Sequence, residues 1–151
     1  MRLLLVRHGQ IPSNVHGILD TAEPGPSLTD LGREQARALV GTLADEPLDG
    51  LWASVLIRTQ ETLDPTAGAR GLPIAVLAGL REVRAGALEG ERTLEAQRAY
   101  MGTVFAWATG DRRRRMPGGE SGHEFFERFD GALAEIAASG VEDAVVASHG
   151  A

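Results

Sequence analysis

Short apolar runs alternate with segments of helical periodicity along the chain, and this alternation limits the folds open to it. The apolar runs cover residues 3–6, 50–54, 73–77 and 144–147. Helical patterns lie between them, at about 29–44, from 55 to near 65, at 92–109 and from 121 onward. Strands that alternate with helices form a parallel sheet covered on both faces. The sequence therefore predicts an α/β fold, a three-layer α/β/α sandwich with a mostly parallel central sheet.

Capping and breaking residues set the expected limits of these elements. Thr29 is expected to cap one helix, and Ser121 with Glu124 forms a capping box for the last one. Pro65 is expected to end or kink the second helix, while residues 9–27 and 79–91 are expected to be loops. The run at 3–6 predicts a buried strand. The expected apolar helix faces are Leu31, Ala36, Leu39, Val40 and Leu43; Leu94, Met101, Val104, Phe105 and Ala108; and Phe125, Phe126, Phe129, Leu133 and Ile136.

The composition excludes several kinds of chemistry. The 151 residues include no cysteine, which excludes disulfides, thiolate nucleophiles and cysteine-ligated metals. All 15 basic residues are arginine, so a Schiff-base lysine and the lysine of a phosphate-binding loop are both missing. The net charge of −6 argues against general nucleic-acid binding. No apolar run approaches the roughly 18 residues of a membrane helix, and we expect a cytoplasmic protein without a membrane partner.

Polar side chains follow each predicted strand at its carboxyl end. They are Arg7 and His8, Ser54 and Arg58, Glu82, and Ser148 with His149. Ligands of parallel sheets bind beyond these ends. Guanidinium groups match phosphate oxygens, neutral imidazole can attack phosphorus, and a carboxylic acid can protonate the leaving alkoxide. Because the arginines can neutralise the developing charge, the pattern predicts phosphoryl chemistry that needs no metal or other cofactor.

Six segments in chain order carry a resemblance to a known family. They are Arg7-His8-Gly9-Gln10 with Asn14; residues 27–32 with Gln35-Ala36; residues 53–59 with Thr62; Leu80-Arg81-Glu82 with Gly86 and Leu88-Glu89-Gly90; residues 117–121; and Ala147-Ser148-His149-Gly150. In this order they resemble the motifs of the histidine phosphatase superfamily, which has the phosphoglycerate mutase-like fold. The resemblance spans residues 2–150, nearly the whole chain.

The resemblance implies a role for each matching residue. His8 would be the nucleophile that forms a phosphohistidine, and Glu82 would be the proton donor. Arg7, Arg58 and His149 would form the phosphate pocket, with His149 also counted as catalytic. Further implied contacts are Asn14 with the phosphate and the Gly9 carbonyl with the His8 ring. Gln10, in the first motif, and Arg112, in the basic run before residue 117, are possible substrate-binding residues.

Some of these residues also have simpler explanations that involve no catalytic role. Glu82 lies in a charged loop and could be a solvated acid, and the run at 112–115 could be a solvated face or could line the mouth of the pocket. His16 and His123 lack a motif and are expected in a loop and in the first turn of a helix, with His16 a weak candidate for lining the pocket. A zinc site from His8, His16 and an acid is conceivable, although its spacing matches no zinc motif.

The resemblance favours a metal-independent phosphomonoesterase, of the histidine acid phosphatase type, that acts on a small phosphorylated metabolite such as a sugar phosphate. A cofactor-dependent phosphoglycerate mutase is the enzymatic alternative, but the stretch after Glu82 lacks the tyrosine and lysine that mutases carry. A non-catalytic phosphate-binding or regulatory module is the alternative of another class, and a homodimer is left open. We expect one domain over residues 1–151, without the C-terminal helix and strand usual in the family.

Overall fold

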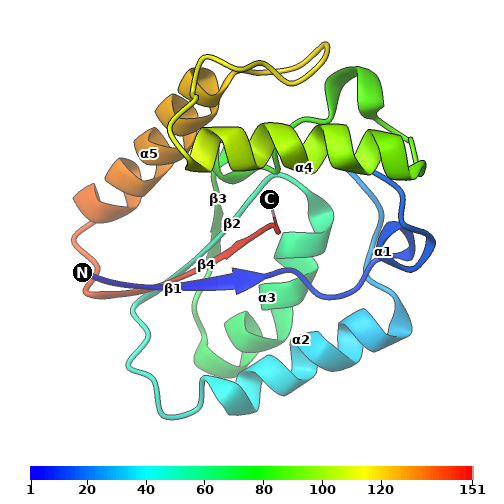
Figure 1. Cartoon of the computed structure of the whole chain (residues 1–151). Coiled ribbons are helices and arrows are strands. Elements are labelled where there is room, and N and C mark those ends of the chain that lie inside the picture. The colour runs from blue at the N-terminus through cyan, green and yellow to red at the C-terminus, as the bar shows by residue number, and fades with distance from the viewer. Residues whose placement is uncertain (151) are drawn as a thin grey trace.

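Four parallel strands form the central sheet of the computed structural model, which describes residues 1–150. The strands are β1 (Arg2–Arg7), β2 (Gly50–Ala53), β3 (Ile74–Val76) and β4 (Asp143–Ser148), in the order β1-β4-β2-β3 (Figure 1). The last strand of the chain thus lies between the first two. Its register pairs Arg7 with Ser148 and Ala53 with Ala147. This order brings the carboxyl ends of β1, β4 and β2 to one edge.

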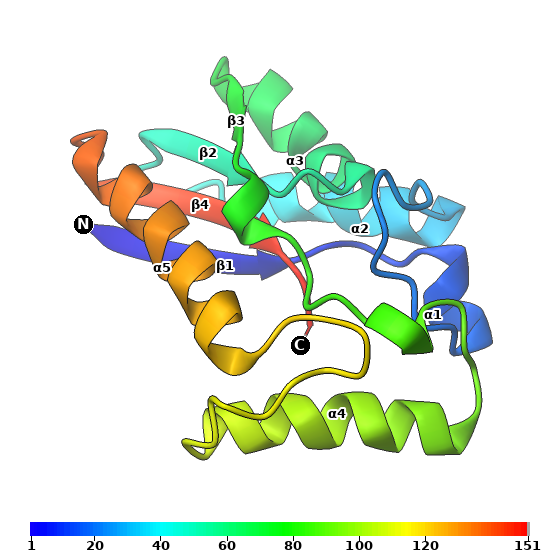
Figure 2. The same ribbon diagram turned by 90° about the horizontal axis from the view of Figure 1, so that it is seen from above.

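Helices cover the sheet on both faces, which confirms the predicted three-layer architecture. The helices are α1 (Pro12–His16), α2 (Asp30–Thr42), α3 (Ile57–Arg70), α4 (Leu94–Ala108) and α5 (Gly122–Ala138), and two single 3₁₀ turns are η1 (Ala78–Leu80) and η2 (Gly86–Leu88). Figure 2 shows α2 and α3 on one face and α5 on the other, with α4 on the side of α5 but farther from the sheet. No helix within residues 1–150 is long and apolar enough to cross a membrane.

The side chains of β4 alternate between two apolar cores. Val145 and Ala147 pack with Leu63 and Leu43 of the α2–α3 layer, whereas Ala144 and Val146 pack with Ile136 of α5. These four side chains in the middle of the strand are fully buried, as expected for a central strand covered on both faces. Burial of this kind fixes the register of β4, and the register fixes where the residues after the strand lie.

The prediction that residues 3–6 form a buried strand is wrong in part. The strand is present, but it lies at the edge of the sheet with β4 as its neighbour, and Leu5 is 62% exposed. The half-buried rings of Phe125, Phe126 and Phe129 pack against the buried cores on this face, and they also line a cavity of about 400 Å³ beside Leu5. Position in the sheet, which the apolar pattern does not encode, decides how deeply such a strand is buried.

Three local predictions are wrong in part. The loop predicted over 9–27 contains the short helix α1, and Pro65 lies inside α3 without ending it, so that a kink there stays a prediction. The buried neighbours Leu63 and Thr66 hold that part of α3 in the core, which outweighs the hydrogen bond that the proline removes. The expected apolar faces also shift: Leu31, Leu94 and Phe105 are 47%, 61% and 65% exposed.

The expected caps are confirmed. The Thr29 hydroxyl accepts the Gly32 N–H at the start of α2, and the Ser121–Glu124 capping box starts α5. In α4 the buried residues are Ala96, Tyr100, Thr103 and Trp107, and Tyr100 and Trp107 join a third core formed with Val83, Ala85 and Met116. This core attaches α4 to the segment that carries Glu82.

Candidate active site

The first residues after β1 and β4 lie side by side at the carboxyl edge of the sheet. The ladder between the strands continues one residue further, since His8 N–H donates to the Ser148 carbonyl at 3.1 Å. The imidazole rings of His8 and His149 consequently lie 5.3 Å apart between centroids, tilted by 60°. Two residues separated by most of the chain are thus brought together by strand pairing.

The His8 ring is held in one tautomer by its neighbour. Its Nδ1 lies 2.7 Å from the Gly9 carbonyl oxygen, and because a carbonyl can only accept, Nδ1 carries the proton. The Nε2 lone pair is therefore the one available for reaction. Burial, helped by the charges of Arg58 and Arg7 and opposed by the Gly9 hydrogen bond, lowers the pKa of His8 to about 4. His8 is accordingly neutral near pH 7.

The peptide group of Gly9 is itself fixed by two contacts. Its N–H donates to the Thr62 hydroxyl at 3.0 Å. A Cβ at Gly9 would lie 2.7 Å from the Gly32 carbonyl oxygen at the start of α2, so a side chain is excluded by close approach. The prediction that the Gly9 carbonyl contacts the His8 ring is confirmed. The need for glycine comes from packing against α2, since Gly9 is not among the glycines with positive φ.

The two ring nitrogens of His149 have different surroundings. Its Nε2 lies 2.8 Å from the Ser54 hydroxyl, while its buried Nδ1 has no hydrogen-bond partner within residues 1–150. The Ser54 hydroxyl accepts the Leu56 N–H and lies 3.1 Å from the Thr59 hydroxyl, so its own proton can go either to Thr59 or to His149 Nε2. When it goes to His149 Nε2, the Nδ1 atom of His149 carries the ring proton. Burial, with the charges of Arg58 and His8, lowers the pKa of His149 to about 2.

Arg58 is a buried guanidinium with unused donors. The residue is 1% exposed, and its Nη2 donates to the Asp20 carbonyl at 3.0 Å. Its Nε and Nη1 have no partner within the described chain. Gly25, at φ +70°, leaves room for this side chain, since a Cβ there would lie 2.8 Å from Nη1. Burial lowers the pKa of Arg58, and the charges of Glu82 and Asp20 oppose that effect. Unpaired buried donors of this kind suit an anionic ligand.

Arg7 and Glu82 flank the backbone of Gly150. A Cβ at Gly150 would lie 2.9 Å from the Arg7 guanidinium carbon, and the Gly150 N–H donates to Glu82 Oε2 at 3.3 Å. The other carboxylate oxygen of Glu82 accepts the N–H of Val83 at 2.9 Å. The predicted proton donor and a predicted phosphate ligand therefore meet at the end of β4.

A cavity of about 350 Å³ opens onto this group. Its walls include Arg7, Asn14 and Glu82 from the predicted site, and Gln97, Tyr100 and Met101 from α4. Asn14 also caps α1, because its side-chain oxygen accepts the Ile11 N–H at 3.1 Å. The cavity is thus bounded by the sheet edge, by the segment around α1 and by α4.

Other candidate residues lie elsewhere. The Gln10 side-chain oxygen accepts from the Thr29 hydroxyl at 2.9 Å, and the Arg112 guanidinium stacks 4.0 Å from the centre of the Phe126 ring. Neither residue lines the 350 Å³ cavity, and the same holds for His8, Arg58 and His149. His16 and His123 are exposed, and His16 lies in α1 instead of the expected loop. Within residues 1–150 no group of three histidine or acidic side chains is placed to hold a metal ion.

Several residues that support the site have no role predicted from the sequence. Ser54 bonds His149 and Thr62 bonds Gly9, although both belong to the arginine motif around Arg58. Tyr100, the single tyrosine of the chain, donates its hydroxyl proton to the Val83 carbonyl at 2.8 Å. The helical pattern around Tyr100 gave no signal of this contact, because the bond joins elements distant in the sequence.

The chain is a parallel α/β sandwich with two histidines and two arginines at the carboxyl edge of its sheet. The model of the histidine phosphatase superfamily (branch 1) matches residues 3–151, and the chain belongs to that family. The expected resemblance is thereby confirmed.

Relatives and solved structures agree with this membership. The chain is 40% identical over 96% of its length to a PE-PGRS family protein of Mycobacterium tuberculosis, and 36% identical over 80% of its length to a glucosyl-3-phosphoglycerate phosphatase of Mycolicibacterium vanbaalenii. It spans 26% of the first relative and 52% of the second. A solved mycobacterial glucosyl-3-phosphoglycerate phosphatase with VO3 matches 98% of this chain and 75% of its own, with a TM-score of 0.81 and 30% identity.

Proposed function

We propose that this chain is a phosphomonoesterase that works through a phosphohistidine on His8 and needs no metal ion. The observation that carries the proposal is the His8 tautomer. The Gly9 carbonyl fixes the proton on Nδ1 and burial keeps the ring neutral, so Nε2 is a ready nucleophile near pH 7. The low pKa of His8 also keeps this nucleophile neutral at moderately acid pH, which supports the acid phosphatase type.

The proposed reaction has two steps. In the first, His8 Nε2 attacks phosphorus, the bond to the ester oxygen breaks, and Glu82 gives its proton to the departing alkoxide. In the second, Glu82 takes a proton from water, whose oxygen attacks phosphorus and breaks the bond to Nε2. Inorganic phosphate leaves and His8 returns to its neutral form.

The charge of the phosphoryl group has matching donors around it. Arg58 offers Nε and Nη1, His149 offers Nδ1, and Arg7 lines the cavity that Glu82 also lines. Fixed donors aimed at the place where negative charge develops are the usual source of a large part of a rate enhancement. Because these donors supply positive charge themselves, the proposed reaction routes no step through a metal ion.

The proposed substrates are small phosphate esters. A cavity of about 350 Å³ is at the lower end of the range for small-molecule sites. The wall from α4 offers an amide and a thioether, Gln97 and Met101, which suits an organic alcohol portion with both polar and apolar groups. Similarity to phosphatases for glucosyl-3-phosphoglycerate and for alpha-ribazole supports a phosphorylated metabolite of this kind.

A hydrolysis assay with p-nitrophenyl phosphate in EDTA tests the proposal. The expected result is turnover that resists the chelator, disappears in His8→Ala and persists in His123→Gln, where an exposed histidine is changed. Rapid acid quenching of the wild type should trap a phosphoryl group that is labile to acid and maps to His8. Turnover retained in His8→Ala, an adduct on another residue, or exchange between 2- and 3-phosphoglycerate stimulated by a bisphosphoglycerate would overturn it.

A further inference from the structure

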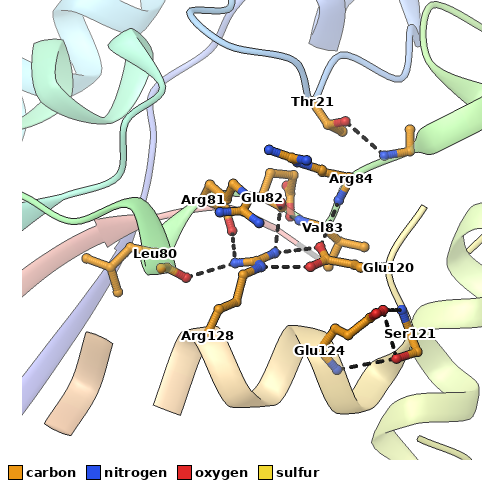
Figure 3. A network of polar contacts seen from close by, with 12 residues as sticks. Thr21, Leu80, Arg81, Glu82, Val83, Arg84, Glu120, Ser121, Glu124 and Arg128 are labelled. Atoms are coloured by element: carbon orange, nitrogen blue, oxygen red, sulfur yellow. Dashed lines mark hydrogen bonds and ion pairs between the residues drawn. The ribbon is translucent and has the colours of Figure 1, made fainter. Parts of the chain in front are cut away.

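An arginine of α5 holds the segment that carries Glu82 by its main chain. Arg128 Nη1 donates to the carbonyl oxygens of Gly79 at 2.8 Å and Arg81 at 2.9 Å, and Nη2 donates to the Glu82 carbonyl at 3.1 Å (Figure 3). The Arg128 side chain is only 12% exposed. One guanidinium thus ties three peptide groups that lead into the proposed acid to a helix on the face of the sheet.

Glu120 completes this arrangement from the loop before α5. Its carboxylate accepts two hydrogen bonds from Arg128, at 2.8 Å from Nε and 2.7 Å from Nη2, and its Oε1 also accepts the N–H of Arg84 at 3.2 Å. The Arg128–Glu120 pair therefore holds the main chain on both sides of Glu82. The fit is close, since a Cβ at Gly79 would lie 2.4 Å from the Arg128 carbonyl oxygen.

The charges of Arg128 and Glu120 also affect the electrostatics of the site. Both side chains are largely buried, at 12% and 9% exposure, so their charges are poorly screened by water. The charge of Arg128 reaches the site: burial is the main cause of the low pKa of His149, and Arg128 adds to the lowering. While Glu120 is bound, the two charges largely cancel, and removing either partner leaves the other uncompensated beside the acid.

We propose that Arg128 and Glu120 are positioning residues that hold Glu82 in place and, by their balanced charges, set the pH range over which it keeps its proton. This inference rests on the proposed role of Glu82 as the acid. The two residues contact the main chain of the segment and act through Glu82.

Several other charged or titratable groups face Glu82 and stay unchanged in the variants below. Arg58 comes from α3 and Tyr100 from α4, and each interacts electrostatically with Glu82. Arg7, at the end of β1, shares its cavity, and the N–H of Gly150, next to His149, bonds its carboxylate. Arg81 and Arg84 belong to the same segment. A shift in the pH dependence of Glu82 on changing Arg128 or Glu120 is therefore measured while the other charged groups around Glu82 stay the same.

Single and double charge removals test the proposal through the pH profile of kcat/KM. In Glu120→Gln the uncompensated Arg128 favours the Glu82 carboxylate, so the alkaline limb should move to lower pH by about half a unit to one unit. In Arg128→Met the uncompensated charge of Glu120 disfavours the Glu82 carboxylate, so the alkaline limb should move to higher pH by a similar amount. The double variant Arg128→Met/Glu120→Gln should return the limb close to its original pH, while kcat stays about 10-fold or more below wild type.

The matched control is the exposed pair Arg115–Glu124, which has the same chemistry at the start of the same helix. Its N–O distance is 2.8 Å, and the side chains are 57% and 51% exposed. Arg115→Met and Glu124→Gln should leave the limb in place, and glutamine keeps the cap of α5. Thermal unfolding of every variant separates a loss of fold from a loss of positioning.

A second readout does not depend on turnover. Carbon-13 NMR of the Glu82 side-chain carboxyl should show the same opposite displacements of its titration in the two single variants. If the Glu82 titration moves in opposite directions in the two single variants but turnover does not depend on His8, the charge balance is supported and the proposed function is not. Unchanged titration in both single variants, or displacement of both in one direction, would overturn the proposal even where the His8→Ala result supports a phosphatase.

Discussion

The two halves of the proposed chemistry are positioned in different ways. The nucleophile side, His8 with His149, is set by the pairing of β1 with β4 and by hydrogen bonds of the peptide backbone next to each histidine. The acid side, Glu82, lies in a segment of 3₁₀ turns and loop whose main chain is held by the side chains of Arg128, Glu120 and Tyr100. Side chains also contribute on the nucleophile side, where Thr62 bonds Gly9 and Ser54 bonds His149, but there they add to strand pairing, whereas Glu82 lies outside the paired strands.

The largest effect is expected on the nucleophile side, from loss of a buried anion ligand. Arg58→Met removes the donors Nε and Nη1 with little change of volume, and kcat/KM should fall by about 10³-fold, or about 4 kcal/mol. Steady-state kinetics with p-nitrophenyl phosphate measures it. Arg33→Met, which changes an exposed arginine, serves as control. A fall below 10-fold in Arg58→Met would remove Arg58 from the phosphate pocket.

The next effect concerns the packing that fixes the His8 ring. Gly9→Ala places a Cβ 2.7 Å from the Gly32 carbonyl oxygen, so the backbone must move and the free energy of unfolding should fall by about 2–4 kcal/mol. Denaturant unfolding measures this loss. The control is Gly41→Ala in α2, where a Cβ meets nothing within 4 Å, and helix propensity predicts a gain of up to about 1 kcal/mol. Equal stability of the two variants would contradict the close approach.

The neutral histidines predict an acid-sensitive fold. Their folded pKa values of about 4 and about 2 lie below the ordinary 6.5, so the unfolded chain binds more protons below pH 6.5. Stability should therefore fall as the pH drops from 6.5 to 4, by up to about 1.4 kcal/mol per pH unit for each histidine. Unfolding at several pH values should show a shallower slope in His149→Asn and an unchanged slope in His123→Gln. A slope insensitive to His149 would show that it is not buried as a neutral ring.

The smallest effect is expected from one of the side chains that hold the acid segment. Tyr100→Phe removes the hydrogen bond to the Val83 carbonyl while the ring stays in its core, so stability should fall by about 1 kcal/mol. Because Val83 follows Glu82, kcat should fall several-fold with little change in KM. If Gly9→Ala changes both KM and kcat while Tyr100→Phe changes kcat alone, the nucleophile side and the acid side differ in how they are positioned. An unchanged kcat in Tyr100→Phe would leave Tyr100 a purely structural contact.

Much of the fold and site follows from local features of the sequence. The alternation of apolar runs with helical patterns predicts parallel strands, and the caps Thr29 and Ser121 mark helix starts, because these signals depend on residues a few positions apart. The polar residues that follow each strand predict the site, since parallel strands end at one edge. The motif around Arg58 indicates a phosphate ligand, while the burial of its guanidinium and its bond to the Asp20 carbonyl are seen only in the structure.

Tertiary structure alone decided the rest, since it depends on contacts between distant segments. The order that places β4 between β1 and β2 leaves β1 at the edge and exposes Leu5, although its apolar run resembles that of a buried strand. The buried face of α4 is selected by the segment it covers, which is why Tyr100 is inside and Phe105 outside. Arg128 lies in an amphipathic helix like any surface arginine, and only folding brings the carbonyl groups of residues 79–82 to its guanidinium, where leaving them unpaired would cost free energy.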